Sequence, residues 1–134
     1  MSDVAPPTGV SAAEASPYAR FLGFRVEAGP EGRVAVLPFA QPLIGNPVLP
    51  ALHGGAVAAF LELAALAELG AGGGRPRTID MTVDYLRPAR PLTTYATVRV
   101  LKRGRRVANV AVEAWQEDRA SPVAAMRGHF MVSG

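Results

Sequence analysis

The 134-residue chain contains no cysteine and only two histidines, His53 and His129. The lack of cysteine excludes a disulfide framework, a thiolate zinc site and a cysteine nucleophile. Two histidines are too few for a metal site built from imidazoles, so we predict no metal. Glu62 and Glu68 interrupt the longest apolar run, which leaves no segment able to span a membrane. No basic stretch followed by an apolar one opens the sequence, and the expected location is therefore the cytoplasm.

The composition is that of a folded domain rather than a disordered chain, with 49% hydrophobic and 19% charged residues. Fourteen glycines and twelve prolines limit how much helix can form. The net charge of +3 and the pI near 10.0 are basic but modest. No aromatic residues interleave with the basic cluster at 102–106, as a base-stacking surface would require, so nucleic-acid binding is not expected.

The length fits a single domain over residues 17–134, preceded by a loose leader over 1–16 that has no hydrophobic periodicity. Proline in the first turn and Gly23 after the last predict a short helix over 17–22. Turn residues at 29–32 join two short apolar runs, which predicts a hairpin of strands 24–28 and 33–39. Residues 40–52 read as a loop.

The segment 55–69 is the single long helix that the sequence predicts, because strong helix formers fill it and glycines follow from Gly70. It is apolar on nearly all sides, and such a helix is buried over most of its surface. In a domain of this size, a sheet must cover it. We therefore predict an α+β fold in which an antiparallel sheet wraps around one helix.

Strands supply most of the second half of the chain. Four apolar residues alternate with four polar ones: Ile79, Met81, Val83 and Tyr85 with Thr78, Asp80, Thr82 and Asp84. This period of two places each set on its own face of one strand. Further strands are predicted over 93–101, 107–115 and 123–132, and the first two are joined by the basic turn at 102–106.

The segment Leu52-His53-Gly54-Gly55 opens the long helix with two adjacent glycines. Backbone N–H groups are uncovered there, and the positive end of the helix dipole favours a ligand oxygen. Glu62 lies nearly two turns after Gly55, roughly on the same face, among apolar neighbours. A carboxylate in that setting is either used chemically or turned to solvent. Spacing alone leaves both interpretations open, whereas Glu68 is expected to be a solvated surface charge.

These residues resemble a known family. Asn46, the His-Gly-Gly motif, Glu62 nine residues after His53, and the segment Val83-Asp84-Tyr85-Leu86-Arg87-Pro88-Ala89 are similar to the hot-dog acyl-CoA thioesterases. The closest match is the PaaI-like branch, which includes 4-hydroxybenzoyl-CoA thioesterases, and it extends from about Tyr18 to Val132. The resemblance implies a curved antiparallel sheet wrapped around one long central α-helix.

The resemblance also implies roles for individual residues. Glu62 would act as general base on water or as nucleophile, and the N–H of Gly54, with Gly55 beside it, would donate to the thioester oxygen. Asn46 would help to position the water or the carbonyl, and His53 would be mainly structural. The loop between Asn46 and His53 is one residue longer than in many relatives, and many relatives have Asp in place of Glu62. Sites of this family lie between subunits, which implies a homodimer or a dimer of dimers.

The substrate implied is an acyl-coenzyme A, which makes coenzyme A part of the substrate rather than a cofactor. Basic residues would hold its phosphates, and the candidates, with the proline beside the first, are Arg87, Pro88, Lys102, Arg103, Arg105 and Arg106. A plain solvated hairpin tip is the alternative for the basic turn. Two other functions stay open: a non-catalytic acyl-CoA-binding module, and a hot-dog hydratase. The hydratase fits less well, because such enzymes pair His with Asp about five residues away and this chain has Ala58 there.

Overall fold

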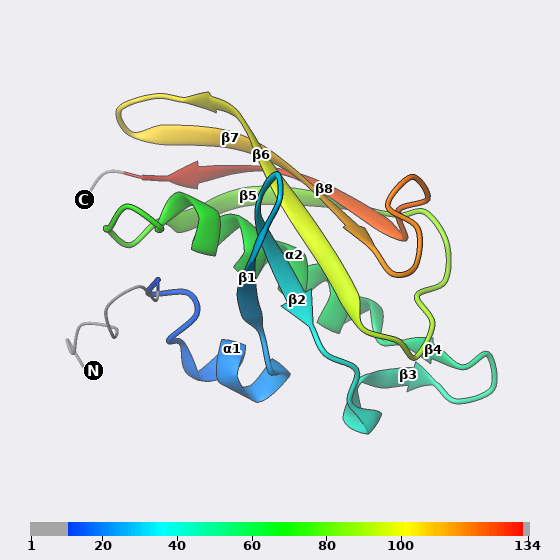
Figure 1. Ribbon diagram of the computed structural model, residues 1–134. Helices are drawn as coiled ribbons and strands as arrows, with labels where there is room; N and C mark the ends of the chain where they lie inside the picture. Colours follow the sequence, from blue (N-terminus) through cyan, green and yellow to red (C-terminus); the bar gives the residue numbers. More distant parts are fainter. Residues whose placement is uncertain (1–10, 133–134) are drawn as a thin grey trace.

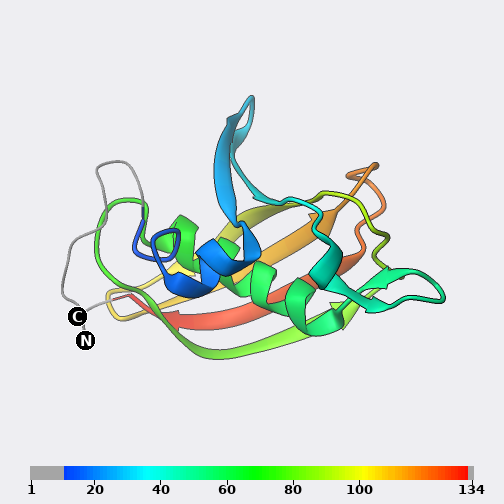
Figure 2. The same ribbon diagram turned by 90° about the horizontal axis from the view of Figure 1, so that it is seen from below.

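The computed structural model describes residues 11–132, so positions 1–10 of the predicted leader lie outside the described residues. A six-stranded antiparallel sheet, in the order β1–β2–β6–β7–β8–β5, curves around the long helix α2 (Gly54–Leu69), as Figures 1 and 2 show. The strands of this sheet are β1 (Arg25–Gly29), β2 (Gly32–Leu37), β5 (Arg77–Tyr85), β6 (Thr94–Arg103), β7 (Val107–Trp115) and β8 (Ala124–Met131). This arrangement confirms the predicted α+β architecture.

The short helix α1 (Pro17–Leu22) forms where the sequence predicts it, for local reasons. The Ser16 hydroxyl accepts a hydrogen bond from the N–H of Ala19 at 3.2 Å, and Gly23 ends the helix in the left-handed conformation with φ of 75°. Before α1, the backbone N–H of Ser11 donates to the Glu14 carboxylate at 2.9 Å. A domain boundary at residue 16 stays a prediction.

The core lies between α2 and the concave face of the sheet. Eight residues of α2 are buried, which agrees with its apolar composition on nearly all sides. Phe60 and Leu61 are fully buried and belong to the same cluster as Phe130 and Met126 of β8 and Val112 of β7. Burial of side chains of this size stabilises the fold by roughly 1.5–3 kcal/mol each, which fixes α2 against the sheet.

The segment predicted as a loop over 40–52 contains more structure than expected. A 3-10 turn, η1 (Gln41–Leu43), leads into a small hairpin of β3 (Ile44–Asn46) and β4 (Ala51–Leu52), whose register is irregular. These strands are too short, and too rich in neighbouring prolines, to produce a period-two pattern. The hairpin ends directly at α2, so it forms one side of the helix start (Figure 1).

Within residues 11–132, no helix has the length and apolar character needed to cross a membrane.

Candidate active site

The start of α2 leaves one backbone donor available. The Nδ1 atom of His53 accepts the N–H of Gly55 at 3.0 Å, and the carbonyl of His53 accepts the N–H groups of Ala56 and Val57 at 3.0 and 3.2 Å. No hydrogen bond among the described residues engages the N–H of Gly54. Of the N–H groups that a helix start leaves without helical partners, the one on Gly54 is therefore free to meet a ligand oxygen.

His53 is the N-cap of α2, a structural role that agrees with the expectation for this residue. Its backbone N–H also donates to the carbonyl of Leu43 at 2.7 Å, which ties the helix start to the hairpin before it. The N–H of Gly55 donates to the His53 ring, whereas no described residue engages the N–H of Gly54.

Tyr85, at the end of β5, contacts the same helix start. Its hydroxyl donates to the carbonyl of Gly54 at 2.8 Å. Its ring atoms lie 3.5 Å from where a β-carbon on Gly54 would be placed. No local sequence pattern predicts this contact, because the two residues are 31 positions apart.

Glu62 is half-buried in the middle of α2, and its carboxylate has one hydrogen-bond partner among residues 11–132. The hydroxyl of Thr78 in β5 donates to Oε2 of Glu62 at 2.6 Å. A hydrogen bond to a carboxylate is short and strong compared with one between neutral groups. It holds one oxygen of Glu62 and leaves the other, Oε1, able to accept a proton.

A β-bulge turns Thr78 toward Glu62, and this corrects the predicted faces of β5. Strict alternation places Ile79 on the inner face with Met81, yet Ile79 is 50% exposed and Thr78 lies opposite the buried Phe130. The register shifts between Thr78 and Asp80, so that one extra residue enters β5 there. Gly128 on β8 makes room for the bulge, because a β-carbon at that position would lie 2.8 Å from the carbonyl oxygen of Asp80.

Gly54 and Glu62 do not meet within one chain. Eight residues separate them along the same helix, which amounts to about 12 Å at 1.5 Å per residue. An oxyanion donor and the group that attacks or activates water must both lie within about 3 Å of the reacting atoms. The helix start and the carboxylate of a single chain are too far apart for that.

Asn46 has its side chain in the turn of the small hairpin. Its Oδ1 atom accepts the N–H groups of Val48 and Leu49 at 3.0 and 3.3 Å, a local turn that this residue type favours. The carbonyl oxygen of the side chain is thus occupied, and only its amide N–H₂ is left to meet a substrate. Val48 and Leu49 at the tip are 90% and 62% exposed.

The predicted phosphate-binding residues fall at opposite ends of the sheet. Arg87 follows β5, with Pro88 exposed beside it, and its guanidinium donates to the carbonyl of Pro122. The basic turn joins β6 to β7 at the far end, where β8 also ends. The length of β8 places about 25 Å between the two groups. One chain does not bring them together.

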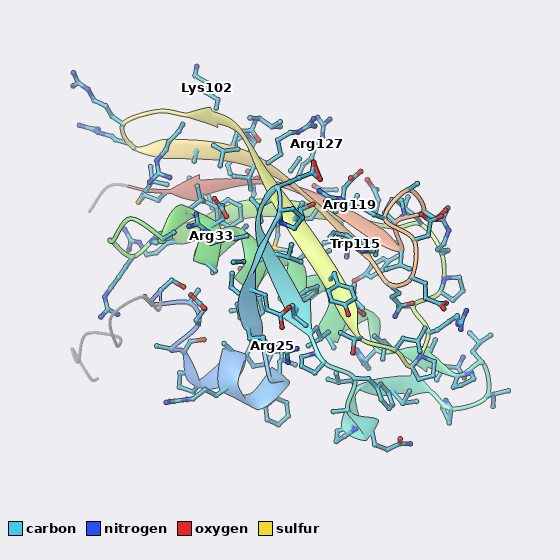
Figure 3. The ribbon with its side chains drawn as sticks, in the orientation of Figure 1. Arg25, Arg33, Lys102, Trp115, Arg119 and Arg127 are labelled. Atoms are coloured by element: carbon cyan, nitrogen blue, oxygen red, sulfur yellow. The ribbon has the colours of Figure 1, made fainter. Side chains whose placement is uncertain are left out.

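Within the basic turn, Arg103 differs from its neighbours, because its guanidinium donates to the carbonyl of Leu69 at the end of α2, at 3.3 Å. Lys102, Arg105 and Arg106 are exposed. Figure 3 shows Lys102 directed away from α2. A groove of about 420 Å³ lies beside it, lined by Lys102, Gly104, Arg106, Val107, Asn109 and His129.

Glu68, expected to be a solvated surface charge, is partly exposed and forms an ion pair. Arg33 of β2, labelled in Figure 3, donates two hydrogen bonds to its carboxylate, at 2.8 and 3.2 Å. Hydrogen bonding to Glu68 raises the pKa of Arg33. The pair borders a cavity of about 720 Å³ between the end of α2, β2 and the turn at 11–14. Glu62 does not line that cavity, so its size does not mark it as the reaction site.

Several known proteins are similar to this chain in sequence or in structure. The model of the thioesterase superfamily matches residues 49–123, a span that includes both the helix start and Glu62. The medium/long-chain acyl-CoA thioesterase YigI of Salmonella typhimurium is 37% identical over 120 aligned positions, which cover 76% of this chain and 77% of that protein. A crystal structure of a Chromobacterium violaceum protein has 39% identity and a TM-score of 0.73, with 91% of this chain and 87% of that chain covered. The Escherichia coli PaaI protein, from the phenylacetic acid degradation operon, shares the fold at 20% identity, with a TM-score of 0.77 and coverage of 90% and 87%.

Proposed function

The chain belongs to the thioesterase superfamily and is an acyl-CoA thioesterase, and we propose that Glu62 of one subunit and Gly54 of a second subunit act together on each thioester. The observation that carries this proposal is that α2 presents both a carboxylate held by a hydroxyl and, at its start, an N–H that no described residue engages. These are the two parts that acyl transfer to water needs.

In the general-base route, Oε1 of Glu62 accepts a proton from a water molecule as the water oxygen attacks the thioester carbonyl carbon. The carbonyl oxygen becomes an oxyanion and accepts the N–H of Gly54, which is already fixed in place. The C–S bond then breaks, the carboxylic acid forms, and the coenzyme A thiolate leaves and is protonated. The hydrogen bond from Thr78 keeps Glu62 oriented during the proton transfer.

In the nucleophilic route, Glu62 itself attacks the carbonyl carbon and expels the thiolate, and water then hydrolyses the resulting anhydride. A single turnover in ¹⁸O-labelled water detects an anhydride that water opens at the Glu62 carboxyl carbon. The general-base route places the label only in the released acid. Water attack on the Glu62 side of an anhydride places it in the enzyme, where mass spectrometry of the peptide that contains Glu62 detects it.

A dimer formed through β5 supplies the second subunit. β5 is an edge strand of the sheet, and Ile79 and Tyr85 on it are 50% and 57% exposed. Antiparallel pairing of two β5 strands around a two-fold axis places the Tyr85 end of each beside the Thr78 end of the other. Each Gly54 would then approach the Glu62 of the partner chain, which removes the 12 Å separation found within one chain. Pairing of such dimers into a tetramer stays a prediction.

For the substrate, we propose a medium- or long-chain acyl-CoA, which the name of the YigI relative supports. Lys102, Arg105 and Arg106 are the better candidates for its phosphates, because their side chains are exposed. Arg87 and Arg103 already donate to backbone carbonyls and have fewer donors to offer.

Replacement of Glu62 tests this proposal. Glu62→Gln keeps the shape of the side chain but removes the base, and kcat on the best acyl-CoA of a C4–C16 panel should fall at least about 100-fold. Glu68→Gln is the matched control in the same helix, and its turnover should stay near that of the wild type. Equal turnover of the Glu62→Gln variant and the wild type would exclude the mechanism.

A further inference from the structure

The peptide group between Gly54 and Gly55 is held at both of its ends. Its N–H, on Gly55, donates to the ring of His53 at 3.0 Å, and its carbonyl, on Gly54, accepts the hydroxyl of Tyr85 at 2.8 Å. The preceding peptide is held through the carbonyl of His53, which accepts two N–H groups of the first turn. All polar groups around Gly54 are thereby engaged by described residues, except its own N–H.

Restraint of the backbone by hydrogen bonds matters more at a glycine than at other residues. Without a β-carbon, Gly54 has wider freedom in its backbone dihedral angles, and a helix start lacks the hydrogen bonds that restrain later turns. An oxyanion donor, in contrast, contributes fully only when its direction is fixed before the reaction. The N–H of Gly54 belongs to the His53–Gly54 peptide, which the first turn holds through the carbonyl of His53. The Gly54–Gly55 peptide, on the other side of the Gly54 α-carbon, is held in addition by the His53 ring and the Tyr85 hydroxyl, which limits rotation about Gly54.

We propose that Tyr85 is a positioning residue for the reaction: together with His53 it clamps the Gly54–Gly55 peptide, so that the N–H of Gly54 is directed at the thioester oxygen. This inference rests on the proposed function, because it gives Gly54 the oxyanion role. Tyr85 lies at the end of β5, and the clamp thus links the edge strand to the start of α2. Within one chain Tyr85 is 57% exposed and is not among the buried residues of the core.

The clamp predicts a specific kinetic signature. Tyr85→Phe keeps the ring and removes only the hydroxyl, and kcat should fall about tenfold while KM changes less than about twofold. Tyr95→Phe is the matched control, because that ring stacks on Trp115 in the sheet, away from the helix start. It should leave both constants unchanged. A rise in KM without a fall in kcat would make Tyr85 a substrate-binding residue and overturn the proposal, as would unchanged kcat.

A double-mutant cycle separates positioning from a general loss of stability. If His53 and Tyr85 hold one peptide, loss of either hydrogen bond frees it, and His53→Ala combined with Tyr85→Phe should cost little more kcat than the worse single variant. Effects that multiply would refute the clamp. Amide exchange of Gly55 should also become faster in the folded Tyr85→Phe protein, and unchanged exchange would contradict the proposal even if a variant were unstable.

Failure of the clamp and failure of the proposed function give different results. If Glu62→Gln is inactive and Tyr85→Phe is fully active, the mechanism stands and the clamp is wrong. If Glu62→Gln remains active, the proposed function itself fails, whatever the Tyr85 variant does.

Discussion

Replacement of Gly54 by proline removes one hydrogen-bond donor and leaves the helix able to form. Proline has no backbone N–H, and the first position of a helix is where it is best tolerated. Gly54 is that position, because His53 is the N-cap. Proline also restricts the residue before it to extended conformations with ψ of about 120–160°. His53 already has φ of −62° and ψ of 129°, so the substitution fits the existing backbone.

The expected cost falls on catalysis rather than on folding. The N–H of Gly54 has no partner among the described residues, so its removal breaks no hydrogen bond there. A β-carbon at this position would lie 3.5 Å from the ring of Tyr85, which is ordinary contact. If this N–H stabilises the oxyanion, kcat should fall about 10²–10³-fold, equivalent to about 3–4 kcal/mol. The melting temperature should change little.

Steady-state hydrolysis of an acyl-CoA, followed through release of the free thiol, measures this effect, and Gly54→Ala is the control. Alanine adds the same β-carbon but keeps the N–H, so its kcat should lie well above that of the proline variant. If both variants lose the same activity, crowding beside Tyr85 is responsible and the donor role is refuted. If the folded proline variant is as active as the wild type, Gly54 does not bind the oxyanion.

The same variant tests whether each site combines two chains. A mixture of Glu62→Gln and Gly54→Pro chains, unfolded and refolded together, forms heterodimers in which one site has both an intact Glu62 and an intact Gly54. Random pairing in a two-fold dimer should restore about a quarter of wild-type activity. If both residues acted within one chain, neither parent nor mixture would be active.

Three further predictions concern the carboxylate and the basic turn. Thr78→Val removes the hydroxyl that donates to Glu62 and should lower kcat about tenfold or more, whereas Thr82→Val on the same strand should not. This can be checked by the same assay, and equal kcat values for the two variants would contradict the role of Thr78. Lys102→Ala should raise KM for acyl-CoA, most clearly at low salt, without changing the melting temperature. Arg103→Ala should instead lower the stability in urea by about 0.3–1 kcal/mol, because it removes a cation that donates to the C-terminus of α2. The opposite pattern for these two variants would show that their roles are reversed.

Several parts of the fold depend on residues close together in the sequence and could be predicted. The long helix was predicted within one residue of its start, because helix formers fill it and glycines follow its end. The helix α1 with Gly23 at its end, and the hairpin of β1 and β2, were predicted from turn and cap chemistry over a few positions. The small hairpin of β3 and β4 was missed, because two or three residues are too few to show a period.

The candidate site was predictable only in its parts. The glycines at the helix start and the isolated carboxylate of Glu62 stand out from their neighbours in the chain. The donor to that carboxylate does not, because Thr78 sits on the outward face in any regular strand. Only the bulge in β5 turns it inward, and the bulge depends on space beside Gly128, about 50 residues later. The same holds for the ion pair between Glu68 and Arg33, because these residues are 35 positions apart and no local pattern links them.

The amino-acid sequence alone therefore determines the long helix, the strands of the large sheet and the chemical types at the site, because propensity, capping and hydrophobic period act over a few neighbouring residues. Which groups meet depends on strand register and on distances through the folded chain. Strand register brings Thr78 within hydrogen-bond distance of Glu62 and Tyr85 within hydrogen-bond distance of Gly54. The length of α2 separates Gly54 from Glu62. A donor and a base 12 Å apart cannot act on one carbonyl, and the proposed mechanism therefore takes Gly54 and Glu62 from different chains.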